Sequence, residues 1–213
     1  MMKLNSYASI VCTILSIIGL TSCSDSDNDY VVNSVINNID GDKVYNLTFG
    51  ESAPIIMSGK DPNDYMNLHS FDIEEAQEKS SQYEIEATAV FTEPIANEGL
   101  DHDSDATNAW NPESKLCSVV IKIETQSKWG KDKTKQLCSA FAKKGFKHIE
   151  WETDNDEGGG FLRKGNIWCT FEYSSDSCEL TIIDINTFPD GEAVVESLIS
   201  KLPSEHRAAL RVP

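Results

Sequence analysis

The sequence predicts an α+β protein built on a mainly antiparallel sheet with helices packed on one face. In several segments every second residue is apolar, which is typical of strands with one buried face. Two other segments, residues 131–144 and 192–202, place apolar residues at helical spacing. In the second half of the chain the expected order is strand, helix, four strands and helix. Such runs of consecutive strands favour an antiparallel sheet over alternating parallel units.

The first half of the globular region contains two predicted strands and one short predicted helix. Residues 44–49 and residues 83–91 alternate apolar and polar side chains, as half-buried strands do. Between these strands, Asp72 and Glu75 have the three-residue spacing of a capping box. This spacing predicts a short helix that ends near Ser80.

The second half has the more complete pattern of elements. Gly145 directly follows the first helical segment and is suited to end it, and Pro203 cannot continue the last one. A hairpin turned at Ser175 and Asp176 joins two of the strands. The predicted strands span residues 117–124, 146–151, 161–163, 167–173 and 178–185, with an acidic, glycine-rich turn at 154–160.

The N-terminus has the layout of a cleaved secretory signal. Lys3 provides a positive start, residues 8–20 form an apolar run too short to span a bilayer, and small residues precede Cys23. The sequence Leu20-Thr21-Ser22-Cys23 resembles a bacterial lipobox. The resemblance implies that residues 1–22 are removed and that Cys23 is diacylated and becomes the first residue. The alternative is an ordinary secretory signal that ends near a chance cysteine.

An acidic segment follows the cysteine. Residues 24–29 contain three aspartates and no basic residue, a composition that favours a solvated linker. The segment resembles the tether of Bacteroidetes surface lipoproteins, which implies export to the outer face of the outer membrane; otherwise the protein would face the periplasm. Acyl chains on Cys23 are sufficient for stable anchoring to a membrane without a spanning helix.

The chain therefore divides into four expected parts. A signal peptide at 1–22 precedes the acylated cysteine and a flexible acidic tether at 23–42. Residues 43–116 form an acidic α+β region with a long loop at 92–114, and residues 117–213 form the β-α-β-β-β-β-α unit. Whether the region 43–116 completes the sheet of the last unit or folds separately stays open at this point.

Charge is distributed unevenly along the chain. Residues 24–116 hold 20 acidic and 4 basic residues, whereas residues 117–213 hold 15 acidic and 13 basic residues. Such acidity argues against non-specific nucleic-acid binding and against a flat approach to anionic headgroups. Eight lysines gather in the second half and are interpreted as a solvated helix face, with a basic patch for an acidic ligand as the alternative: Lys122, Lys128, Lys131, Lys133, Lys135, Lys143, Lys144 and Lys147.

Four cysteines remain after the signal and the lipidated cysteine: Cys117, Cys138, Cys169 and Cys178. An even number in an exported chain permits disulfides, but each cysteine belongs to an apolar face, which favours buried thiols. In the expected hairpin Tyr173 faces Cys178, so Cys169 is too distant to bridge it. The absence of a CxxC or Cys/His pattern argues against zinc, and no cofactor is expected.

Asp101, Asp103 and Asp105 have the spacing with which a calcium-binding loop begins. The match fails further on, where Ala106 replaces the turn glycine and Pro112 replaces the bidentate glutamate. A solvated acidic loop is therefore the preferred interpretation, and calcium is the alternative.

Two tryptophans are candidates for ligand binding, because both are expected in exposed loops. Trp110 lies near the end of the long loop and Trp129 lies before Gly130. Exposed tryptophans stack on sugars or anchor protein partners.

These observations favour a lipid-anchored, non-enzymatic binding module of the bacterial envelope, with a glycan or an envelope protein as its partner. The alternative is an acidic periplasmic inhibitor or immunity-type lipoprotein that neutralises a basic protein, since charge accelerates such associations. A hydrolase is the least favoured reading, because the chain has no GxSxG, HExxH or phosphate-binding motif.

Overall fold

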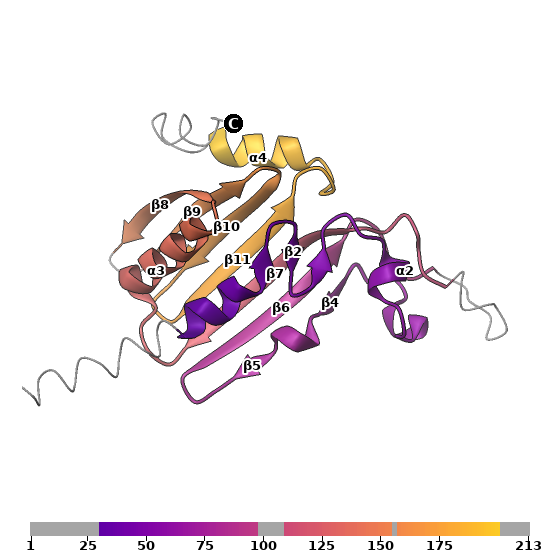
Figure 1. Cartoon of the computed structure of the whole chain (residues 1–213), viewed down its shortest axis with the longest axis horizontal. Helices are drawn as coiled ribbons and strands as arrows, with labels where there is room; N and C mark the ends of the chain where they lie inside the picture. The colour runs from indigo at the N-terminus through magenta and orange to yellow at the C-terminus, as the bar shows by residue number, and fades with distance from the viewer. Residues whose placement is uncertain (1–29, 98–108, 155–156, 201–213) are drawn as a thin grey trace, which may run out of the picture.

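The computed structural model describes residues 30–97, 109–154 and 157–200, and its centre is one eight-stranded antiparallel sheet (Figure 1). The strands run in the order β4-β6-β7-β11-β10-β9-β8, and β5 also pairs with β6. Their bounds are β4 Ser70–Asp72, β5 Glu78–Lys79, β6 Tyr83–Phe91, β7 Leu116–Thr125, β8 Lys147–Asp154, β9 Glu157–Lys164, β10 Ile167–Tyr173 and β11 Ser177–Asp184. The expected α+β class with a mainly antiparallel sheet is confirmed.

Strands from both halves of the chain form this one sheet. Strand β6 pairs with β7 from Tyr83 opposite Thr125 to Phe91 opposite Leu116. The region that begins at residue 43 thus completes the sheet of the C-terminal strands.

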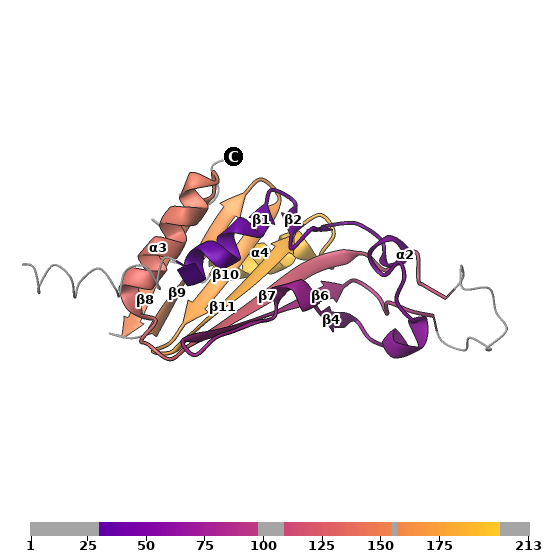
Figure 2. The same ribbon diagram turned by 60° about the horizontal axis from the view of Figure 1, so that its bottom comes forward.

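One face of the sheet carries the larger core. Helix α3, Gly130–Lys143, lies on this face together with the helix at residues 30–37 (Figure 2). A small sheet of β1 Ile39–Asp40, β2 Lys43–Val44 and β3 Leu47–Thr48 lies beside them. The buried cluster joins residues of these elements to inward-facing strand residues, among them Val35, Ile39, Leu137, Phe141, Ile121, Cys169 and Leu180.

The expected flexible tether does not extend over residues 30–42. Residues 30–37 are helical, and Val31, Val32, Val35 and Ile36 are at most 4% exposed. This prediction was wrong because the apolar residues recur at helical spacing and have the sheet to pack against.

The last helix covers the opposite face, which corrects the expectation that the helices share one face. Helix α4, Gly191–Ser200, packs Val195 and Ile199 on three side chains of the sheet: Phe161, Trp168 and Ile183. Trp168 precedes Cys169 in β10, so it points away from the larger core. Gly191 permits this approach, since a Cβ there would lie 2.4 Å from the carbonyl oxygen of Ile185.

Two short elements differ from the sequence prediction. The segment 44–49 is two strands instead of one, because Tyr45 and Asn46 have φ values of 50° and 67° and turn a hairpin that pairs Val44 with Leu47. The capping-box helix is also wrong. Only a 3₁₀ turn, Glu74–Ala76, separates β4 from β5, and the remaining short elements are α2 Ala53–Ile56 and the 3₁₀ turn Pro62–Tyr65.

The cysteine prediction is confirmed. Cys117, Cys138, Cys169 and Cys178 are free and buried, and burial raises the pKa of the Cys117 thiol to about 11. Cys169 lies opposite Ile182 and Tyr173 lies opposite Cys178, as the two-residue hairpin turn required. Across the described part of the chain, no helix combines the length and the apolar character needed to span a bilayer.

Candidate functional site

Trp129 is not an exposed platform. Its side chain is 1% exposed, and its indole N–H donates to the hydroxyl of Thr134 at 3.1 Å. It stands directly before Gly130, the first residue of α3, and its backbone N–H donates to the carbonyl of Ser175. The expected exposure is wrong because the side chain folds back under the first turn of the helix.

Trp110 is also buried, with 8% of its surface exposed. Its ring packs against the Tyr65 ring, with 5.9 Å between the ring centroids, and its backbone forms an isolated antiparallel β-bridge with Ala96. Neither tryptophan thus offers an open aromatic face, and the stacking of a sugar on them loses its structural basis.

The remaining candidates, Asp101, Asp103, Asp105 and Cys23, lie outside the described residues. Within residues 30–97, 109–154 and 157–200, no cluster of histidine, cysteine, aspartate or glutamate side chains is arranged to hold a metal ion.

The structure assembles a different site on the side of the sheet that carries α4. Beyond the end covered by α4, the strands present a row of charged side chains, which we call the acidic sheet face. It comprises Glu84 and Glu86 of β6, Lys122 and Glu124 of β7, Glu179 of β11 and Glu172 of β10.

Strand register places these side chains next to one another. Glu86 lies opposite Lys122, Lys122 lies opposite Glu179, and Glu179 lies opposite Glu172. A second row pairs Glu84 with Glu124. Directly opposite residues lie about 5 Å apart at their Cβ atoms, so the carboxylates act as one charged surface.

Lysines neutralise only part of the negative charge of these two rows. Lys122 bonds Glu124 at 2.6 Å, and Lys79, at the sheet edge, bonds both carboxylate oxygens of Glu84 at 2.8 and 2.6 Å. These hydrogen bonds raise the pKa of each lysine, so both lysines are cations at neutral pH. Across the acidic sheet face and Lys79, five carboxylates thus face two ammonium groups.

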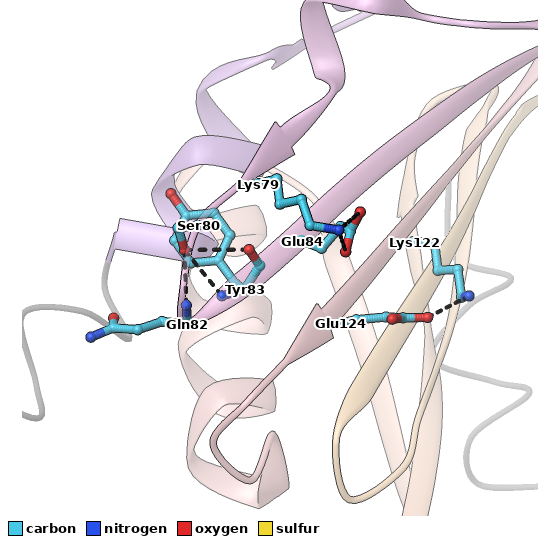
Figure 3. A network of polar contacts seen from close by, with 7 residues as sticks. All are labelled: Lys79, Ser80, Gln82, Tyr83, Glu84, Lys122 and Glu124. Atoms are coloured by element: carbon cyan, nitrogen blue, oxygen red, sulfur yellow. Dashed lines mark hydrogen bonds and ion pairs between the residues drawn. The ribbon is translucent and has the colours of Figure 1, made fainter.

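A depression of about 500 Å³ lies where the acidic sheet face meets the strand ends, and we call it the strand-end pocket. Figure 3 shows Lys79 reaching over Glu84, with Ser80 and Tyr83 beside them and the Lys122–Glu124 pair on the next strand. The lining residues are Lys79, Ser80, Tyr83, Glu84, Glu124, Thr125, Gln126, Asp176 and Ser177.

The wall at Ser80 and Tyr83 is rigidly built. The Ser80 hydroxyl oxygen accepts the backbone N–H groups of Gln82 and Tyr83, both at 3.1 Å. The Tyr83 hydroxyl donates to Glu78, and burial together with hydrogen bonding raises the pKa of Tyr83. The pocket thus offers fixed polar groups, and none of its lining carboxylates or hydroxyls forms a nucleophile–base pair with another.

A second depression of about 310 Å³ continues the surface across β11 and β10. Its lining includes Lys122, Glu172 and Glu179, together with Glu157 at the start of β9. The two depressions share Ser177, and together they extend the acidic surface over several adjacent strands.

Sequence reasoning missed this site, although part of its signal was visible. Glu84 and Glu86 alternate with buried residues in β6, as Lys122 and Glu124 do in β7, so each outward face could be predicted. The pairing of β7 with β11 could not be predicted, nor could the fact that α4 covers only one end of this face of the sheet. Both depend on tertiary structure.

Comparison of the chain with protein-family models, with curated proteins and with solved structures finds no match in any of the three.

Proposed function

We propose that this protein is a lipoprotein of the bacterial envelope that binds a basic protein partner through its acidic sheet face. The observation that carries the proposal is the open surface of β6, β7, β11 and β10, where five carboxylates outnumber the lysines. An extended surface of one charge speeds the encounter with a partner of opposite charge and disfavours partners of like charge.

The same geometry favours a protein partner over a glycan. Trp110 and Trp129 are buried, and the aromatic rings beside the two depressions, Tyr83 and Tyr173, are only partly exposed or buried. A sugar would thus lack the exposed ring on which it usually stacks. Of the partners that the sequence suggested, which were a glycan, an envelope protein and a basic protein, the basic protein is the best fit.

Reversing charge at the centre of the face tests the proposal. The double variant Glu86→Lys with Glu179→Lys replaces the two carboxylates that flank Lys122 in its row. We expect the association rate with the cognate partner, identified by cross-linking on intact envelopes, to fall about tenfold or more at low salt. Stopped-flow binding at several ionic strengths measures this rate.

A matched control carries the same change in net charge elsewhere. Glu75 and Glu192 are exposed, and neither belongs to the acidic sheet face, so Glu75→Lys with Glu192→Lys should bind like the wild type. Equal association rates for the two double variants would contradict the proposal. A wild-type association rate that does not change with ionic strength would contradict it as well.

The anchoring part of the proposal has its own test at Cys23. We expect Cys23→Ala to abolish lipid attachment and move the protein from the detergent phase to the aqueous phase, since the acyl chains provide the membrane affinity. Phase partition and the mass of the mature N-terminus measure this change. Cys12→Ala, inside the expected signal, is the control and should remain lipidated. If the mature N-terminus of the wild type carried no acyl chain, the anchoring proposal would be wrong.

A further inference from the structure

The connection from β7 to α3 holds a serine and a lysine in direct contact. The Lys133 ammonium nitrogen lies 2.8 Å from the hydroxyl oxygen of Ser127. Ser127 is exposed to solvent, whereas Lys133 is only 4% exposed. An accessible hydroxyl backed by a buried amine is the arrangement in which a lysine can serve as the base for a serine nucleophile.

The surroundings of Lys133 favour its neutral form. Burial lowers the pKa of the amine, and within the described part of the chain no carboxylate pairs with it. Lys133 also belongs to the first turn of α3, where the positive end of the helix dipole disfavours a cation. The Trp129 ring, 5.8 Å from Nζ, acts in the opposite direction.

Four further charged residues belong to the segments next to the pair. Lys128, Lys131 and Asp132 belong to the same segment, and Asp176 lies in the β10–β11 turn that packs against it. Ser174 donates to the Asp176 carboxylate. Two of these residues are lysines and two are aspartates, and burial is the cause that lowers the pKa of Lys133.

Contacts with the β10–β11 turn fix the position of the serine. The Thr125 hydroxyl, on a residue 8% exposed, bonds the carbonyl of Ser127 and lies 3.2 Å from the carbonyl of Asp176. The backbone N–H of Trp129 donates to the carbonyl of Ser175 at 2.8 Å. Ser127 is therefore held from both sides rather than placed on a free loop.

We propose that Ser127 is a nucleophile that accepts acyl groups from esters, with Lys133 as its general base. The Ser127 oxygen bonds to the ester carbonyl carbon while its proton passes to the Lys133 nitrogen. The ester C–O bond then breaks, and the leaving alkoxide takes that proton. Water next adds to the acyl carbon and gives a proton to Lys133, which returns it to the departing Ser127 oxygen. The net reaction converts ester and water into acid and alcohol.

Two nearby features suit this chemistry. Helix α3 has no side-chain cap at its N-terminus, and the N–H groups of a first helical turn have no acceptor within the helix, so this end of α3 is suited to stabilise a developing oxyanion. Thr125, Gln126 and Asp176 line the strand-end pocket, so the space for a bound ester begins one residue before the nucleophile.

A fluorophosphonate probe tests the pair on the full folded chain. The probe bonds its phosphorus to an activated serine oxygen and releases fluoride, and the serine proton leaves through the base. We expect one adduct per chain, located on Ser127 by peptide mass spectrometry. Ser127→Ala should remove the adduct, and Lys133→Met should slow its formation about 100-fold or more. Ser200→Ala, at the exposed end of α4, should label like the wild type.

The pH dependence gives a readout that a structural lysine would not produce. Because the reactive form needs neutral Lys133, the wild-type labelling rate should rise with pH and level off below 10.5, the ordinary pKa of a lysine. Lys133→Arg keeps the cation but cannot lose its proton, so it should be as slow as Lys133→Met. No adduct on the wild type, an adduct on another residue, folded Lys133 variants that label as fast as the wild type, or a wild-type rate that rises without a plateau would each overturn the assignment.

Discussion

Replacing Trp129 with alanine is expected to lower the free energy of unfolding by about 3–5 kcal/mol. The side chain is among the largest that are fully buried, and its removal leaves a cavity beneath the first turn of α3. It also removes the indole donor that bonds Thr134, whose hydroxyl in turn donates to the carbonyl of Gly130. Urea unfolding followed by far-UV circular dichroism measures the change.

Trp129→Phe separates packing from hydrogen bonding. Phenylalanine keeps much of the buried apolar volume but loses the bond to Thr134, so we expect a smaller decrease in the free energy of unfolding, with about 1 kcal/mol of it from the hydrogen bond itself. If Trp129 were an exposed ligand platform, both variants would lie within about 0.5 kcal/mol of the wild type. That result would contradict the burial described above.

Replacing Val35 with aspartate is expected to destabilise the protein by about 4 kcal/mol or more. Val35 is 0% exposed in the helix at residues 30–37, so the variant places a carboxylate inside the larger core. A buried charge without a partner is one of the most damaging single changes. The melting temperature, measured by calorimetry at neutral pH, reports the effect.

Asn33→Asp is the control, because it adds the same charge two residues away at an exposed position of the same helix. It should leave the melting temperature close to that of the wild type. A flexible tether would tolerate both substitutions equally, so indistinguishable melting curves for the two variants would reject the docking of this helix on the sheet.

Much of the sheet could be predicted because alternation is a local property. The strand at 83–91 has the predicted bounds, and the register of β10 with β11 follows from the turn at Ser175 and Asp176. Helix α3 ends near Gly145, which has a φ of 88° and fits the expected role of that glycine. These features each depend on a few neighbouring residues.

The features of the fold that could not be predicted from the sequence depend on contacts between distant segments. Val31, Val32, Val35 and Ile36 have helical spacing, but valine and isoleucine are moderate helix formers, and the acidic residues before them suggested a linker. No spacing rule distinguishes the buried Lys133 from the exposed lysines near it, since its burial comes from the packing of α3 against the sheet. The acidic sheet face likewise exists only after β6, β7, β11 and β10 have paired.

Because the folded part begins at Tyr30, a molecule anchored at Cys23 would have only a short tether. Tyr30 already belongs to the helix that docks on the sheet, so an anchor at Cys23 leaves seven peptide units between lipid and fold. A fully extended chain of that length reaches about 25 Å. The near side of the fold of an anchored molecule would therefore stay within about 25 Å of the bilayer. Its partner would have to approach the membrane surface to bind it.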